Sequence, residues 1–189
     1  MNQDSIMIER QWTDRAKQAY ELGLEYEKTY HGCGQCTVAA VLDALDQFDE
    51  SVFRAATGIA GGMGLMGDGP CGAYVGASMA FGLLSPRRRE FFDGDRENKY
   101  GTYAMIQRLR ERFLQHYGSF TCRGVQEHVI GRGFDLRDPQ DRQAFEQAGA
   151  HEDKCPLVVA QAARWAVEIV AEQQITMPAV GTSDEERVE

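Results

Sequence analysis

The fold is decided by residues 71–84, which read CGAYVGASMAFGLL. This run is almost wholly apolar, and small side chains recur along it. The pattern is typical of a helix that packs very closely against a neighbour, because glycine leaves room where two backbones meet. The run is too short and too rich in glycine to span a bilayer. We therefore expect a helix packed tightly within this chain or against a second copy of it, so a homodimer is one expected assembly.

Helical periodicity continues on both sides of this run, and no segment alternates as a strand would. Ser51 is a suitable N-cap, Gly118 a suitable C-terminal stop, and Asp138-Pro139 a suitable helix start. The further helices are expected at about 5–28, 34–48, 51–57, 96–117, 139–148 and 156–174, with a short helical turn after Thr121. The sequence thus predicts the all-α class, as a single-domain bundle of about six to seven helices with glycine-rich connections. Residues 1–175 form this domain, and 176–189 form an acidic tail that we expect to be disordered.

The composition narrows the partners and the compartment. The formal charge of −9 argues against nucleic acid or an anionic membrane as the main partner. No apolar core of a secretory signal follows the polar N-terminus, so we expect a cytoplasmic protein with no membrane insertion. Thiols stay reduced in the cytoplasm. The chain has five cysteines, an odd number, whereas a framework of disulfide bonds needs an even number.

Four of the five cysteines lie where helices are expected to begin: Cys36, Cys71, Cys122 and Cys155. A helix N-terminus presents unpaired N–H groups and a partial positive charge, which lowers a thiol pKa and favours the thiolate. The thiolate is the form that binds metal or acts as a nucleophile. A single cysteine at such a place is more often a small buried residue. As a set, the four predict one redox or metal site. His31 and His151 lie near Cys33 and Cys155 and are candidate substitute ligands, although a histidine in such a loop is more often simply solvated.

The stretch Cys71-Gly72-Ala73-Tyr74-Val75-Gly76 resembles the central motif of the redox-active proteins named for the pattern C_GCAxxG_C_C. The similarity extends over about residues 30–165, with Cys36, Cys122 and Cys155 in the places of the other family cysteines. It implies a small helical protein whose four cysteines serve redox chemistry, with iron–sulfur ligation as one form of it. Cys33 is a thiol beyond the pattern, and between the two we favour Cys36 as the ligand.

The leading hypothesis is therefore an iron–sulfur cluster, [2Fe–2S] in form, on Cys36, Cys71, Cys122 and Cys155. Three glycines, Gly62, Gly64 and Gly72, would let the backbone approach this cofactor closely. The function would be electron transfer with a redox partner protein, or redox sensing, and the sequence leaves open whether a reaction is catalysed. One alternative is a metal-free thiol–disulfide protein that uses Cys33 and Cys36. Another is a structural zinc site in an interaction protein.

Overall fold

The computed structural model describes residues 3–173, and within that range the chain forms eight α-helices and no strand. They are α1 (Gln3–Tyr30), α2 (Cys33–Ala44), α3 (Glu50–Ala55), α4 (Gly72–Leu84), α5 (Arg96–Tyr117), α6 (Cys122–Ile130), α7 (Pro139–Gln147) and α8 (Cys155–Glu172). The all-α class is confirmed. The number is higher than expected because the segment after Thr121 forms the nine-residue helix α6 rather than a turn. The expected acidic tail, 176–189, lies outside the described residues.

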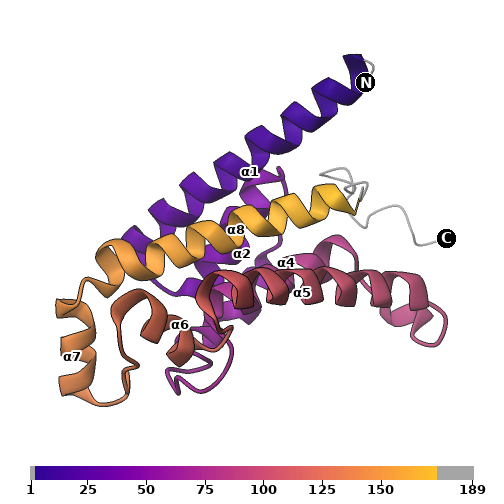
Figure 1. Cartoon of the computed structure of the whole chain (residues 1–189). Coiled ribbons are helices and arrows are strands. Elements are labelled where there is room, and N and C mark those ends of the chain that lie inside the picture. The colour runs from indigo at the N-terminus through magenta and orange to yellow at the C-terminus, as the bar shows by residue number, and fades with distance from the viewer. Residues whose placement is uncertain (1–2, 174–189) are drawn as a thin grey trace.

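Helices α1 and α8 run side by side and form the most extensive contact between any two of the described elements (Figure 1). Small residues let them approach closely: a Cβ added to Gly23 of α1 would lie 3.0 Å from the Cα of Ala160 in α8. Helix α2 packs against both α1 and α8, and α4 and α5 also pack on α8. The core between these helices is made of alanine, valine, leucine and phenylalanine side chains.

Helix α4 is the helix that the opening stretch of sequence predicts, and it packs on the start of α2. A Cβ on Gly76 would lie only 2.4 Å from the carbonyl oxygen of Gly34, and one on Gly72 only 2.3 Å from the Sγ atom of Cys33. Gly82, further along the same helix, has no neighbour within 4 Å of such a Cβ. Two of the three glycines of α4 are thus used for close packing within the chain.

The helix ends follow the expected capping rules with one exception. Asp138 caps α7, accepting hydrogen bonds from the backbone of Gln140 and Asp141, and Gly118 ends α5 with a φ of 70°. The expected cap at Ser51 is wrong. Asp49 caps α3 instead: α3 begins at Glu50, and the Asp49 carboxylate accepts the Val52 N–H at 2.8 Å.

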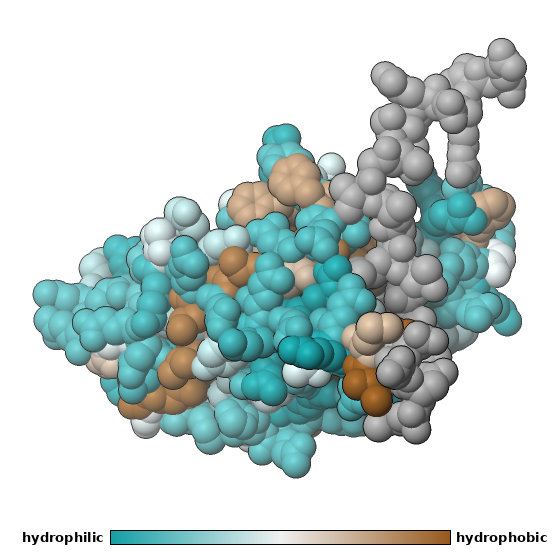
Figure 2. Space-filling view, turned by 90° about the horizontal axis from the view of Figure 1, so that it is seen from above, coloured by the Kyte–Doolittle hydropathy of each residue, from teal (hydrophilic) through white to brown (hydrophobic). Residues whose placement is uncertain are grey.

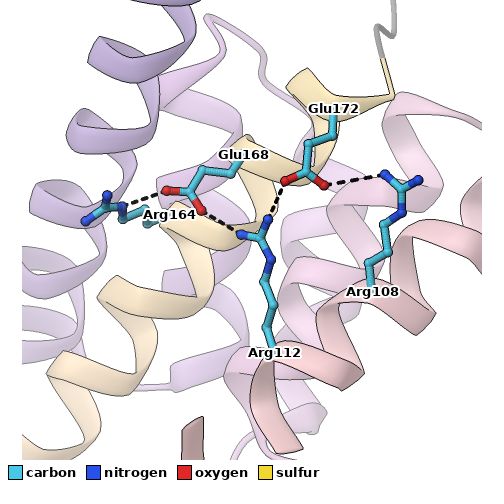
Figure 3. Close-up of polar contacts among 5 residues, drawn as sticks. All are labelled: Arg108, Arg112, Arg164, Glu168 and Glu172. Carbon is cyan, nitrogen blue, oxygen red and sulfur yellow. Dashed lines mark hydrogen bonds and ion pairs between the residues drawn. The ribbon is translucent and has the colours of Figure 1, made fainter. Parts of the chain in front are cut away.

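A network of ion pairs joins α5 to α8 (Figure 3). Arg112 of α5 contacts Glu168 at 2.6 Å and Glu172 at 2.5 Å, and Arg108 contacts Glu172 at 3.4 Å. Arg164 holds the other carboxylate oxygen of Glu168 at 2.8 Å. Figure 2 shows that the surface seen there is mainly hydrophilic, with separate hydrophobic patches. Of the helices described, none has the length and apolar character needed to cross a membrane.

Candidate metal centre

Four helix starts converge on one cavity of about 270 Å³. Cys33 is the first residue of α2, Cys71 the N-cap of α4, Cys122 the first residue of α6, and Cys155 the first residue of α8. All four line the cavity. The rest of the wall is mostly apolar, with side chains such as Val125, Val158 and Leu136. The chain thus gathers four thiols from four separate helices around one space.

The structure brings together three of the four cysteines expected at the site, and it replaces the fourth by a near neighbour. Cys36 does not line the cavity. Its thiol is buried one helical turn further along α2 and donates to the backbone oxygen of His31 at 3.1 Å. Because α2 begins at Cys33, it is Cys33 that occupies the position at the helix start.

The thiols of the cavity are held in their neutral form. Burial, together with the negative charge of the neighbouring thiolate at Cys122, raises the pKa of Cys71 to about 12. Burial raises the pKa of Cys122 to about 12 as well, and it raises those of Cys33 and Cys155 well above the ordinary value. The expected lowering of the pKa by helix N-termini is therefore wrong for the metal-free site. The N–H groups of Ala73 and Tyr74 do favour the Cys71 thiolate, but burial outweighs them.

The glycine-rich loop 58–69 covers the side of the cavity next to Cys122. Gly62 has a φ of 67°, and a Cβ there would lie 2.7 Å from the Cβ of Cys122. The loop is joined to α6 through the Cys122 N–H, which donates to the Gly69 oxygen at 2.9 Å. Two of the three expected backbone-approach positions, Gly62 and Gly72, thus lie against cavity cysteines. Gly64 does not, because no atom lies within 4 Å of a Cβ added there.

Two buried polar residues at the cavity were not identified from the sequence. Gln126 donates from Nε2 to the Cys122 sulfur at 3.4 Å, and its Oε1 accepts the Phe134 N–H at 2.9 Å. Glu27 of α1 is only 2% exposed and lines the same cavity. The sequence carries one signal for Glu27: it continues the spacing of Ala19 and Gly23 along the buried face of α1.

The two histidines considered as substitute ligands lie together at the cavity wall. The rings of His31 and His151 lie with their centroids 4.3 Å apart and their planes tilted by 52°. His151 is held by Glu146, whose carboxylate lies 2.8 Å from Nδ1. His31 has a φ of 57°, an uncommon backbone conformation outside glycine that tends to mark functional sites. These rings form a polar side of a mostly apolar cavity.

The donor groups at the cavity do not form a metal site as they are placed. In residues 3–173, no group of three or more histidine, cysteine or acidic side chains is placed to hold a metal ion as it stands. The cavity volume is many times the roughly 15 Å³ that one water requires. The four thiols therefore surround a space instead of meeting at a point.

Comparison with known proteins finds one family. The family model described as "Putative redox-active protein (C_GCAxxG_C_C)" matches residues 31–169. This match confirms the resemblance seen in the sequence, and its range contains all five cysteines. No curated protein and no solved structure matches the chain.

Proposed function

This chain belongs to the C_GCAxxG_C_C family of redox-active proteins, and we propose that it binds an iron–sulfur cluster through Cys33, Cys71, Cys122 and Cys155. The observation that carries the proposal is the convergence of these four thiols on one cavity. Four cysteine thiolates are the usual ligand set of such clusters. A cluster of several atoms also suits thiols that surround a space of about 270 Å³. When bound, it would accept and release single electrons, in exchange with a redox partner protein.

Several groups of the chain are placed to stabilise a cluster bound in the cavity. Helix N-termini direct backbone N–H groups at sulfur, as Ala73 and Tyr74 do at Cys71. Gln126 donates a further N–H to Cys122, and the apolar wall limits the access of water. The raised thiol pKa values mean that protons leave the sulfurs only when positive charge enters.

The two alternatives have less support from the geometry. Thiol–disulfide exchange needs a thiolate, but burial raises the pKa of Cys33 and of Cys36 well above the ordinary value. A structural zinc ion needs four donors at about 2.0–2.3 Å around one point, and the described residues offer no such group. The cluster is therefore the function that this site fits best.

The proposed ligand set predicts that replacing Cys33 removes the bound cluster, whereas replacing Cys36, the other cysteine of α2, does not. The Cys33→Ser variant, purified without oxygen, is expected to lose bound iron and its visible charge-transfer bands. Cys36→Ser is expected to retain both, because the Cys36 thiol donates to the His31 backbone oxygen and does not line the cavity. Iron, sulfide and zinc contents per chain give the measurement, and two irons with two sulfides would correspond to the [2Fe–2S] form. Iron retained by the Cys33 variant and lost by the Cys36 variant would contradict the assignment.

The hydrogen bond from Gln126 predicts a shift in redox potential. An N–H donor on a ligand sulfur stabilises the reduced, more negative state, so its removal lowers the potential. A loss of about 1 kcal/mol corresponds to about 40 mV for a one-electron couple. Gln126→Met removes the donor with little change in volume. A redox titration should show this fall for Gln126→Met and none for Gln143→Leu, on the exposed surface of α7. Equal potentials in the two variants would show that the bond has no such role.

A further inference from the structure

The carboxyl group of Glu27 is buried at the cavity without a full set of partners. Glu27 is 2% exposed, and its Oε2 atom has no hydrogen-bond partner. Among the side chains that the structure describes, no other buried nitrogen or oxygen atom lacks a hydrogen-bond partner. A buried carboxyl oxygen left unpaired costs on the order of 1–3 kcal/mol or more, so its presence calls for a physical reason.

The surroundings of Glu27 supply almost no positive charge. The thiols that interact with its carboxyl electrostatically are those of Cys33, Cys36, Cys71 and Cys155. Two interactions favour the Glu27 carboxylate: a hydrogen bond with the Cys36 side chain, and the charge of His151 when that ring is protonated. In the metal-free cavity the thiols are neutral, and burial raises the pKa of the Glu27 carboxyl to about 7. A cation that enters the cavity would therefore find a carboxylate as well as thiolates able to form beside it.

Neither water nor a proton satisfies Oε2 as well as a metal does. A buried water needs two to four polar partners, and the wall of the cavity that Glu27 lines is mostly apolar. A proton on Oε2 would itself need an acceptor there. A metal atom held by the adjacent thiols would use the free oxygen directly, because iron accepts both oxygen and sulfur donors.

We propose that Glu27 is a fifth protein ligand of the metal centre, bound through Oε2. This inference rests on the proposed function, since it requires metal in the cavity. Glu27 also lies outside the range matched by the family model, so the family's cysteine pattern does not include it. A carboxylate is a harder ligand than a thiolate, and it would make one iron of the cluster different from the rest.

The test is Mössbauer spectroscopy of the full chain reconstituted without oxygen with ⁵⁷Fe and sulfide. Wild-type protein should show one iron site that differs from an all-thiolate site. Glu27→Gln should alter the parameters of that site or lose its iron, and Glu27→Asp, which keeps the carboxylate, should restore the signal in part. Circular dichroism of the metal-free variants checks that each is folded.

The matched control is Glu21→Gln, which makes the same change in another carboxylate of α1. The Glu21 side chain is exposed, pairs with Lys17 and does not line the cavity, so its variant should keep the wild-type spectrum. A Glu27→Gln spectrum that superimposes on the wild type would overturn the ligand role and leave the cluster in place. Absence of iron and sulfide from the wild-type protein would instead overturn the proposed function, and with it this inference.

Discussion

Replacing Gly76 by alanine is expected to destabilise the protein by about 3 kcal/mol. The added Cβ would lie 2.4 Å from the carbonyl oxygen of Gly34 and 3.0 Å from the Cβ of Thr37. The first contact is with backbone, which cannot rotate away, so α2 and α4 must move apart. At about 2–4 °C per kcal/mol for a chain of this size, the melting temperature should fall by about 6–12 °C. Thermal or urea unfolding of the metal-free protein, followed by circular dichroism, measures it.

The control is Gly82→Ala in the same helix. No atom lies within 4 Å of a Cβ at Gly82, so this variant gains only the better helix propensity of alanine. It should be more stable than the wild type by about 0.5–1 kcal/mol. Similar effects of the two substitutions would show that close packing of α4 on α2 is not what makes glycine necessary at position 76.

The glycines of α4 connect the fold to the site. Gly72 and Gly76 are one helical turn apart, so they share the face that meets the start of α2. Without a Cβ at Gly72, the Cys33 sulfur can lie against the first turn of α4, next to Cys71. The spacing of cysteine and glycines in the motif is therefore a packing requirement that places two thiols at one cavity.

The helices could be predicted from the sequence because their signals are local. The period of about 3.6 residues, Gly118 and Asp138 all act within a few residues of the element they define. The cap of α3 was misplaced for the same reason, since Asp49 and Ser51 are both good caps and only the path of the chain decides between them. Local sequence signals thus predict which helices form more reliably than they predict the residue at which each helix begins or ends.

The site could be predicted only in part because its geometry is long-range. Convergence of helix starts was expected, but the choice between Cys33 and Cys36 depends on the residue at which α2 begins. The sign of the thiol pKa shifts depends on burial, which sequence spacing does not report. Glu27 stands in the charged run Glu25-Tyr26-Glu27-Lys28, which reads as an exposed surface. Its burial is known only once α8 and the cavity are in place.

Removing the charge of Glu27 is expected to stabilise the metal-free protein at pH values above 7. Burial raises the pKa of the Glu27 carboxyl from 4.5 to about 7 in the folded state. Between these pH values the unfolded chain releases this proton while the folded chain retains it, so stability falls as pH rises through this window. Above the folded pKa the loss is complete. Each tenfold difference in proton affinity is worth about 1.4 kcal/mol, which sets the loss at about 3 kcal/mol.

Glu27→Gln lacks this titration, so its advantage over the wild type depends on pH. Urea unfolding with a metal chelator present should show the variant more stable by about 3 kcal/mol near pH 8, and by little near pH 4.5. Glu21→Gln, the same change in an exposed carboxylate of α1, is the matched control. An advantage for Glu27→Gln that is equal at both pH values would contradict the burial of an unpaired carboxylate. Metal binding should cancel the advantage, because a carboxylate that destabilises the empty cavity becomes a favourable contact once a cation is beside it.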